Sequence, residues 1–488
     1  MIDLKALRED PERFRLGAAR KRIGVEIDRI LDLDARRREL TVARDEARAE
    51  QKRIEKELGK EIGRLSGGLK KAEGAEREAI QRELEAIKQR PAALKLKVQE
   101  AEEALAAVEP ELDALLLHVP QPPDADVPVG ESAEDNVEIR RWNPEGFDPE
   151  AGFAASRGFR ARSHVELMRA LDLVDFERAV KISGSRSYVL KGAGMRLHLA
   201  VLRYAFDFMV NEQGFTPVTA PVLVREEMMT GTGFFPAGRE QSYSIDESRR
   251  SDPDGERQVG DLSHQRQVGD LSHRDLFLAG TGEVGLMGLR AGEILDEAEL
   301  PLRYVTWSDC FRREAGAAGK DTAGLYRIHH FQKVEQVVIG RADEAESRAW
   351  HAKMIGSVET ILQRLGLPYR LLQCCTADLG PKNADMIDIE CWMPSRGEVV
   401  DGAATGAYGE THSASRLYDY QCRRLNMRYR EGGEGGKGAT TFCHSLNNTV
   451  VASPRILIPL VEMYQEEDGS IGVPEVLRGY MGGVERID

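Results

Sequence analysis

Two long heptad repeats near the N-terminus constrain the fold of this chain more than any other feature of its sequence. In the first run, apolar residues recur every seventh position from about residue 27 onward. In the second, they alternate at steps of four and three. This spacing gives each helix one apolar stripe, and two such helices bury their stripes against each other. The stripe residues are Leu33, Leu40, Ala47, Ile54, Leu58, Ile62 and Leu65, followed by Ile80, Leu84, Ile87, Leu94, Val98, Ala101, Leu105, Val108, Leu112 and Leu115.

The segment Ser66-Gly67-Gly68 separates the two runs and predicts a turn between antiparallel helices. A first helix of roughly 38 residues at ~1.5 Å per residue would extend on the order of 50 to 60 Å, beyond any compact core. Pro91 lies within the second predicted helix, where its missing N–H predicts a kink. The sequence therefore predicts a projecting helical hairpin, called the arm below.

The length and composition of the chain narrow its class. Its 488 residues exceed what one compact core usually holds, so we expect two or three domains. It has no apolar run of about 20 residues and no basic-then-apolar start, so we expect a cytoplasmic protein with no membrane partner. Its six cysteines are too scattered for a disulfide framework, and we expect them to be reduced core residues.

The polar faces of the arm are rich in basic residues interleaved with Glu, although the chain has a formal net charge of −14. These residues either form ion pairs on a solvated surface or contact the phosphates of a nucleic acid. Composition alone favours ion pairs. The candidates for phosphate contact are Arg36, Arg37, Arg44, Lys52, Lys70 and Lys71.

A proline-rich segment after His118 predicts a domain boundary. We predict an arm at 1–118, a linker and the start of a second domain at 119–190, and the main domain at 191–488. In the main domain, a helix is predicted over 195–214. Strands are predicted over 215–224, 304–314, 329–340 and 385–393. Such widely separated strands favour an α+β fold with a mostly antiparallel sheet flanked by helices.

The segment FRREAGAAGKDTAGLYRIHHFQKVE predicts a β-hairpin with an unusual set of side chains. Residues at even spacing share one face of a strand, so Arg312 and Glu314 should point the same way. Arg327, Phe331 and Glu335 should do so on the return strand. Guanidinium groups suit phosphates, a ring suits adenine and a carboxylate suits an amine. An Arg–Glu ladder alone would usually be ordinary cross-strand pairing.

This segment resembles the second signature motif of the class II aminoacyl-tRNA synthetases in its seryl version, which reads FR-x-E-A-G, then G-[RK]-D-T-x-G-L, then R-x-H-x-F-x-K-V-E. The resemblance covers nearly the whole chain. NEQGFTPVTAPVLV is similar to the first, dimer-forming motif, TGE to the serine loop, ETHS to the metal-and-ATP strand, and VVASPRILIPLVE to the third motif. VPVGESAEDNVEIRRW and VPEVLRGYMGG also resemble this family.

The resemblance implies a helical arm followed by a class II catalytic domain, in a homodimer. It implies an ATP-dependent ligase that activates L-serine as seryl-adenylate and transfers serine to the 3′ end of tRNA(Ser), with tRNA(Sec) as a further substrate. ATP is then a substrate, Mg²⁺ a cofactor, and no DNA partner is implied. With this family in view, we expect the arm to contact the backbone of tRNA.

The resemblance also implies roles for single residues. Arg312, Glu314 and Arg455 are expected to be catalytic. The expected ATP site is Arg312, Arg313, Glu314, Arg327, Phe331, Glu410, Thr411, His412, Ser413 and Arg455, with Glu410 and Ser413 holding Mg²⁺. The expected serine site is Thr281, Gly282, Glu283, Arg312, Glu335, Asn447 and Thr449. In that site Glu335 would accept the ammonium group of serine, and Glu283 would reach its hydroxyl group.

The sequence departs from the family pattern in places. Ala414, His330 and Gly409 stand where cysteine, glutamine and arginine are usual. Glycine in TGE replaces a commoner alanine, which predicts a slightly looser loop. The stretch RGEVVDGAATGAYG is longer than the pattern, and the octapeptide RQVGDLSH occurs at 257–264 and 266–273, which predicts a surface insertion.

Three other functions stay open at this point. A non-catalytic tRNA-binding paralogue would be expected to have lost some of the charged site residues, which are all present. A ligase that loads a carrier protein would not need the long basic arm. A specialised duplicate synthetase, serving a dedicated pathway or inhibitor resistance, is compatible with the sequence.

Overall fold

The structure is a computed structural model that describes residues 2–245, 276–316, 324–400, 402–432 and 438–488. The chain forms two compact units. The arm unit comprises Leu4–Arg15 and Gly24–Val119, and the core unit comprises Met1–Asp3, Leu16–Ile23 and Pro120–Asp488. The repeated octapeptide at 257–273 lies outside the described residues. No described helix combines the length and apolarity needed to cross a membrane.

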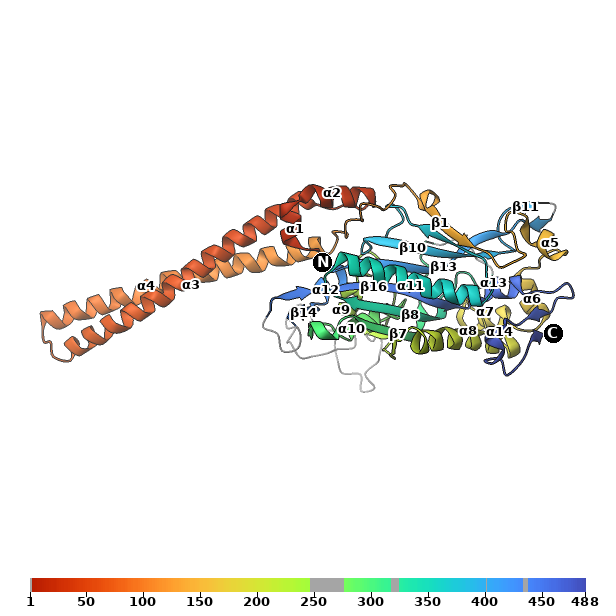
Figure 1. Ribbon diagram of the computed structural model, residues 1–488. Coiled ribbons are helices and arrows are strands. Elements are labelled where there is room, and N and C mark those ends of the chain that lie inside the picture. Colours follow the sequence, from red (N-terminus) through yellow and green to blue (C-terminus); the bar gives the residue numbers. More distant parts are fainter. Residues whose placement is uncertain (1, 246–275, 317–323, 401, 433–437) are drawn as a thin grey trace, which may run out of the picture. The chain divides into compact units, whose positions relative to one another are not determined.

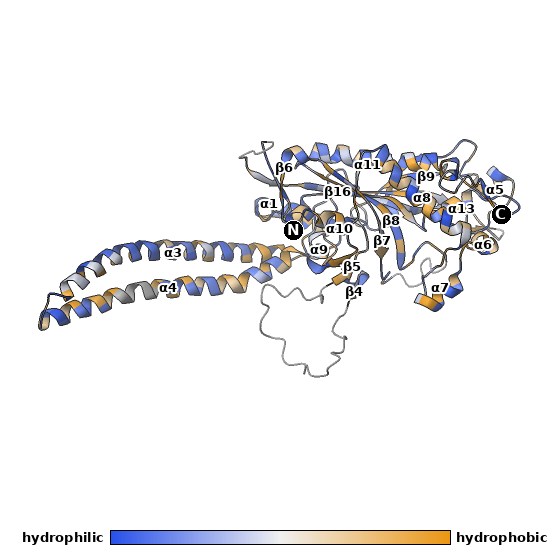
Figure 2. Cartoon of the chain, turned by 90° about the horizontal axis from the view of Figure 1, so that it is seen from below, coloured by the Kyte–Doolittle hydropathy of each residue, from blue (hydrophilic) through white to orange (hydrophobic). Residues whose placement is uncertain are grey.

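Two long helices, α3 (Ile27–Leu69) and α4 (Ala75–Leu116), form the arm and lie side by side (Figure 1). Their contact is apolar, with Leu58 and Leu65 packed against Leu84 and Ile87. Hydrophilic and hydrophobic residues are interleaved along both helices (Figure 2), as the heptad repeat predicts. The hairpin is therefore confirmed.

The turn of the arm differs from the prediction. Gly67 and Gly68 belong to α3, and the connection follows at 70–74, where Gly74 has a φ of 61°. The amide of Ala72 donates to the carbonyl of Gly68 over 3.1 Å, which closes the end of the helix. Helix α4 continues through Pro91 without a break, and the kink expected at this residue stays a prediction.

An eight-stranded sheet forms the centre of the core unit, in the order β1-β9-β10-β13-β16-β8-β7-β2. Every neighbouring pair is antiparallel except β2 with β7. The fold is therefore α+β, as predicted. The strands are β1 (Val137–Trp142), β9 (Tyr369–Gln373), β10 (Asp385–Met393), β13 (Ala407–Tyr418), β16 (His444–Ser453), β8 (His330–Gly340), β7 (Leu302–Phe311) and β2 (Thr216–Pro217).

The two faces of the sheet have different partners. On one face, α8 (Gly192–Asn211) and α11 (Glu344–Arg364) pack against alternate residues such as Val334 and Val338 (Figure 1). On the other, α10 (Glu283–Gly288) and α12 (Tyr420–Arg424) pack against Val337 and Ile339. Phe331, Lys333 and Glu335 share this second face by their period-two spacing.

Shorter elements complete the core unit, and all six cysteines are free and buried. The predicted strand at 215–224 consists of β2 and the beginning of β3. The remaining helices are α1 (Leu4–Glu9), α2 (Pro11–Arg20), α5 (Gly152–Arg157), α6 (His164–Ala170), α7 (Phe176–Ser183), α9 (Glu226–Gly231), α13 (Leu457–Met463) and α14 (Glu475–Arg478), of which α1 and the start of α2 belong to the arm unit. The remaining strands are β3 (Leu223–Arg225), β4 (Tyr243–Ile245), β5 (Leu276–Leu278), β6 (Ile294–Asp296), β11 (Val399–Val400), β12 (Ala403–Ala404), β14 (Arg428–Arg430), β15 (Thr440–Phe442), β17 (Ile471–Gly472) and β18 (Arg486–Ile487).

Candidate active site

A cavity lies on the second face of the sheet. A neighbouring cavity shares Arg312 and Glu314 with it and is also lined by Arg327. Most residues predicted to bind ATP therefore converge, although they come from distant parts of the sequence. Those that line the first cavity are Arg312, Glu314, Phe331, Glu410, Thr411, His412 and Arg455.

Arg312 and Glu314 reach the cavity through a turn rather than through strand alternation. Strand β7 ends at Phe311, and Glu314 has a φ of 50°, in the left-handed region that few non-glycine residues adopt. Arg312 donates from Nε to the carbonyl of Gly280 over 3.2 Å, and its guanidinium lies 5.3 Å from the ring centre of Phe331. Arg327 also lies outside a strand, and forms an ion pair of 3.2 Å with Glu314.

Arg313 lies apart from the other residues predicted to bind ATP. Its side chain lines a different cavity, which includes Glu226, Arg239 and Ser244. Its amide donates to the carbonyl of Gln241 over 2.9 Å. Neighbouring residues at the end of an extended strand point to opposite sides, so Arg312 and Arg313 diverge.

Arg455 is stacked on an aromatic ring that the sequence reasoning did not identify. Its guanidinium lies 4.5 Å from the ring centre of Tyr326, and its Nε donates to the carbonyl of Tyr326 over 3.1 Å. Nη1 donates to the carbonyl of Glu410 over 3.2 Å and lies 3.7 Å from its carboxylate. These contacts hold the guanidinium at the cavity wall.

A β-bulge in β13 places Glu410 and Ser413 on the same face of the sheet. Glu390 pairs with Glu410 and Ile389 pairs with His412, so Thr411 is an extra residue. Residues three apart normally face opposite ways, and one extra residue reverses that relation. Strand β16 has a similar bulge, which brings both Thr449 and Ala452 to the cavity.

Asp388 stands directly opposite Ser413 on β10 and is hydrogen-bonded to its side chain. Burial, and secondly the negative charge of Glu410, raises the pKa of Asp388 well above its ordinary value. Its Oδ1 is buried and has no hydrogen-bond partner among the described residues. The face next to Glu410 thus carries several oxygen atoms, and the raised pKa favours the neutral form of Asp388.

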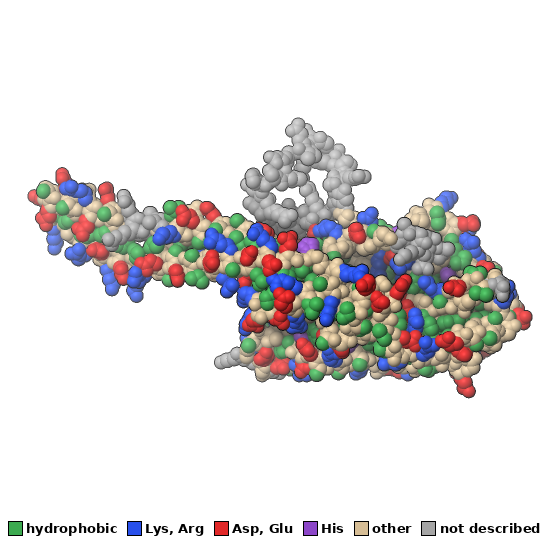
Figure 3. All heavy atoms as spheres, turned by 90° about the horizontal axis from the view of Figure 1, so that it is seen from above, with side chains coloured by type: hydrophobic (Ala, Val, Ile, Leu, Met, Phe, Trp, Pro, Cys, Tyr) green, Lys and Arg blue, Asp and Glu red, His purple; other side chains and the backbone are tan. Residues whose placement is uncertain are grey.

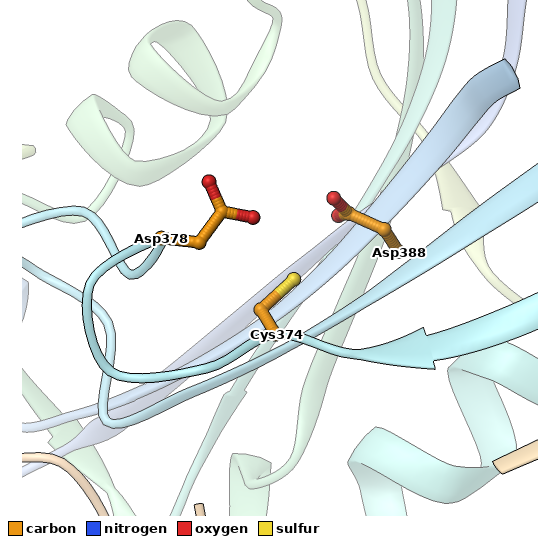
Figure 4. A group of neighbouring side chains, drawn as sticks. All are labelled: Cys374, Asp378 and Asp388. Carbon is orange, nitrogen blue, oxygen red and sulfur yellow. The ribbon is translucent and has the colours of Figure 1, made fainter. Parts of the chain in front are cut away.

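Asp388 also belongs to a cluster with Cys374 and Asp378, whose ligand atoms all lie within 4.8 Å of one another. In Figure 4 the two carboxyl groups are directed toward each other, with the sulphur of Cys374 near the gap between them. Burial raises the pKa of the Cys374 thiol, which keeps it protonated, and Asn136 donates to Asp378 over 2.8 Å. A protonated thiol is a poor metal ligand, so hydrogen bonding accounts better for this cluster.

His412 is neutral in its buried position. Burial, and secondly the charge of Arg455, lowers its pKa to about 3. Its Nδ1 lies 2.8 Å from the hydroxyl of Thr411, which itself lies 3.1 Å from the carbonyl of Ile389. The ring therefore contributes no positive charge to the cavity at neutral pH.

At the wall of the cavity, Lys333 connects several residues predicted to bind serine. Its ammonium forms an ion pair with Glu335, donates to Thr281 Oγ1 over 2.8 Å and to Thr449 Oγ1 over 3.4 Å. Burial raises the pKa of Glu335, and the charge of Lys333 opposes this shift. The sequence reasoning missed Lys333, although it lies two residues from both Phe331 and Glu335.

Gly282 contradicts the expectation of a looser loop. A Cβ atom at this position would lie 2.5 Å from Cγ2 of Thr306 and 2.9 Å from Oγ of Ser308. The absence of a side chain therefore permits the loop to approach the sheet closely. The next residue, Glu283, is 2% exposed. Asn447 lies two residues before Thr449 on β16 and on the same face of the sheet. Its side chain is buried but does not line the cavity.

The candidate tRNA-contacting residues of the arm fall into two groups. Three form local ion pairs, Arg36 with Glu39 (3.4 Å), Arg37 with Asp34 (2.8 Å) and Arg44 with Asp45 (2.8 Å). Three are exposed and take part in no ion pair among the described residues, namely Lys52, Lys70 and Lys71. Positive and negative groups are mixed along the arm (Figure 3). Neither ion pairing alone nor phosphate contact alone therefore accounts for all its charged residues.

Comparisons with known proteins match both units. Residues 1–123 match the family described as the seryl-tRNA synthetase N-terminal domain, and residues 267–464 match the tRNA synthetase class II core domain (G, H, P, S and T). The serine–tRNA ligase of Deinococcus radiodurans is 38% identical, over 99% of this chain and 98% of that protein. That of Rhodospirillum centenum is 39% identical, over 100% and 99%.

Solved structures give the same result. The crystal structure of seryl-tRNA synthetase from Pyrococcus horikoshii complexed with ATP has a TM-score of 0.79 and 33% identity, and covers 100% of this chain and 99% of that one. The cytoplasmic serine–tRNA ligase from Naegleria fowleri in complex with AMP has a TM-score of 0.75 and 28% identity, with coverage of 98% and 96%. The similarity thus extends over the whole chain rather than one motif.

Proposed function

This chain belongs to the seryl-tRNA synthetase family of class II aminoacyl-tRNA synthetases, and we propose that it activates L-serine with ATP and transfers serine to the 3′ end of tRNA(Ser) and tRNA(Sec). The observation that carries this proposal is the convergence of Arg312, Phe331 and Arg455 on one cavity, with Glu335 buried next to it. An ATP-dependent serine–tRNA ligase needs such a meeting point for triphosphate, adenine and amino acid.

In the proposed ATP site, Phe331 stacks on adenine, and Arg455 covers the opposite face of the adenine ring. Arg312 binds the α-phosphate and the serine carboxylate, which brings two anions together. Glu314, held by Arg327, contacts ATP on the same side. No nucleophile from the protein is needed, because the serine carboxylate itself attacks phosphorus and pyrophosphate leaves.

Glu410 and Ser413 suit Mg²⁺, which prefers oxygen ligands. The bulge places both on one face, and the negative charge of Glu410 favours a cation there. We propose that the Ser413 hydroxyl donates a hydrogen bond to Asp388 and keeps its oxygen lone pairs for the ion. When bound, Mg²⁺ would offset the negative charge of the phosphates. His412 and Thr411 shape the wall next to it.

In the proposed serine site, Glu335 accepts the ammonium group while Thr281, Gly282 and Glu283 enclose the side chain. Glu283 accepts a hydrogen bond from the hydroxyl group. A site that hydrogen-bonds a hydroxyl rejects an analogue without it by ~10⁴-fold, because its buried partner would be left unpaired. Asn447 and Thr449 support this site from β16.

The remaining partners follow from the proposed family role. Lys52, Lys70 and Lys71, with Arg36, Arg37 and Arg44, contact the tRNA backbone and read its shape rather than its bases. The protein acts as a cytoplasmic homodimer.

Amino-acid-dependent exchange of pyrophosphate into ATP, measured with the full-length protein and each amino acid, tests the activation step. Charging of tRNA(Ser), tRNA(Sec) and a carrier protein with labelled serine tests the transfer. We expect exchange with serine alone and transfer to tRNA. Exchange with a different amino acid, or transfer of serine to the carrier protein only, would contradict the proposal.

A further inference from the structure

We propose that Lys382 is a positioning residue for amino-acid selection, because its ammonium group orients the Glu283 carboxylate toward the hydroxyl group of the amino acid. This inference rests on the proposed function, in which Glu283 contacts that hydroxyl. Lys382 belongs to none of the motifs through which the sequence resembles its family.

Lys382 and Glu283 form a two-point contact inside the core unit. The ammonium donates to Oε1 over 2.8 Å and to Oε2 over 2.7 Å. The side chain of Glu283 is 2% exposed and that of Lys382 is 13% exposed. The amide of Gln421 also donates to Oε1, over 2.7 Å. An interaction between opposite charges that are shielded from water in this way is stronger than one at the surface.

These hydrogen bonds limit what Glu283 can still accept. A carboxylate has about four lone-pair positions, two on each oxygen. Oε1 accepts two hydrogen bonds, from Lys382 and Gln421, and is filled. Oε2 accepts one, from Lys382, and keeps one position for a further donor. A single hydroxyl group of an amino acid matches that one remaining position.

The loop that carries Lys382 is fixed from several sides. Lys21 donates to the carbonyls of Gly380 (2.9 Å) and Asn383 (2.5 Å). The amide of Gln121 donates to the carbonyl of Pro381 over 2.8 Å. The ammonium of Lys382 also lies 4.0 Å from the ring centre of Phe234. Lys382 therefore approaches Glu283 from a fixed backbone.

Two buried ion pairs lie close together here. Lys333 compensates Glu335, and Lys382 compensates Glu283, and the charges of the two pairs affect one another. Removing the ammonium of Lys382 would leave one buried carboxylate without its counter-ion. Such a group takes up a proton or turns toward water, and it then no longer accepts a hydrogen bond in the required direction.

The test compares three variants of the full-length protein in pyrophosphate exchange. Lys382→Met removes the charge and the donor, and Lys382→Gln removes the charge but keeps a donor. Lys353→Met is the matched control, since Lys353 is an exposed lysine that also lies over an aromatic ring, that of Trp350. For each protein, KM for serine, KM for ATP and the preference for serine over alanine are measured.

We expect KM for serine to rise at least tenfold in Lys382→Met and the serine-over-alanine preference to fall at least tenfold, while KM for ATP stays within twofold. Lys382→Gln should show a smaller change in the same direction, and Lys353→Met should show none. A role in folding alone would lower the apparent kcat through a smaller folded fraction and leave both KM values unchanged.

If the unaltered protein shows serine-dependent exchange, two results would overturn the inference about Lys382 and leave the proposed function standing. One is an unchanged KM for serine in Lys382→Met. The other is a joint loss of ATP and serine use, or failure to fold, in both Lys382 variants. If the unaltered protein shows no serine-dependent exchange, the proposed function fails first, and this inference fails with it.

Discussion

The arm and the core unit obtain their structures in opposite ways. In the arm, the apolar cluster of Leu58, Leu65, Leu84 and Ile87 follows from a repeat that is visible in the sequence. In the core unit, the cavity is assembled from residues as distant as Arg312 and Arg455, and it depends on a turn and two bulges. The arm should therefore tolerate single substitutions, whereas the core should be sensitive to a few positions.

Replacing Arg312 by alanine should have the largest effect and tests the sensitivity of the core. The removal of one guanidinium from the phosphate site should lower exchange about 10²- to 10³-fold, the range for losing one preorganised donor. Arg313→Ala is the matched control, because its side chain lies in a different cavity. Steady-state exchange rates are measured for both variants. Equal losses in the two would contradict the assignment of Arg312 to the phosphate site.

Shortening the arm tests whether the two units have separate tasks. Removal of residues 46–101, with a short glycine-rich turn in their place, keeps the lower part of α3 and α4. We expect kcat/KM for tRNA charging to fall about 100-fold, because phosphate contacts at Lys52, Lys70 and Lys71 are lost. Exchange should stay within about twofold. A parallel loss of exchange would show that the arm supports the active site.

Gly282→Ala tests how closely the core is packed. The added methyl group would overlap Thr306, and overpacking of this kind costs about 1 to 3 kcal/mol. We expect kcat/KM for serine to fall about tenfold. Adding Thr306→Ala should restore part of the activity, since this removes the nearest atom. Full activity of the single variant would mean that the loop moves freely.

Lys21 belongs to residues 16–23, which are part of the core unit although their neighbours in the sequence belong to the arm unit. Replacing Lys21 tests how firmly this segment is buried in the core unit. Burial lowers the pKa of Lys21 to about 7, and the charge of Asp124 opposes this shift. The unfolded chain therefore binds more protons than the folded protein between about pH 7 and 10.4, and stability from this group rises with pH across that window.

Urea unfolding at pH 7 and pH 9 measures this effect. The stability of the unaltered protein relative to Lys21→Met should increase by on the order of 1 kcal/mol between these values. Because the two proteins share all titrating groups except Lys21, the comparison cancels the effects of the other groups. A difference between the two proteins that does not depend on pH would show that burial does not lower the pKa of Lys21.

The sequence predicted the arm and much of the site because both follow periodic rules. Period-two spacing correctly placed Phe331 and Glu335 on one face, and it would also have found Lys333. It does not account for Arg312, Glu314 and Arg327, because these residues lie outside the strands. Tyr326 and Lys382 gave no signal, since loops place them against residues that are remote in sequence. The turn of the arm was misplaced because its glycines were taken to end α3.

The bulges in β13 and β16 each accommodate one extra residue without changing the strand pairing on either side. Deleting Thr411 would leave Glu410 opposite Glu390, His412 opposite Ile389 and Ser413 opposite Asp388, so both proposed metal ligands would stay on one face of the sheet. Random libraries of this protein should therefore keep Glu410 and Ser413 in place after a single-codon deletion at Thr411, although the side chain of Thr411 itself is lost. A sequence alignment with a one-residue gap at Thr411 would still assign both proposed ligands correctly.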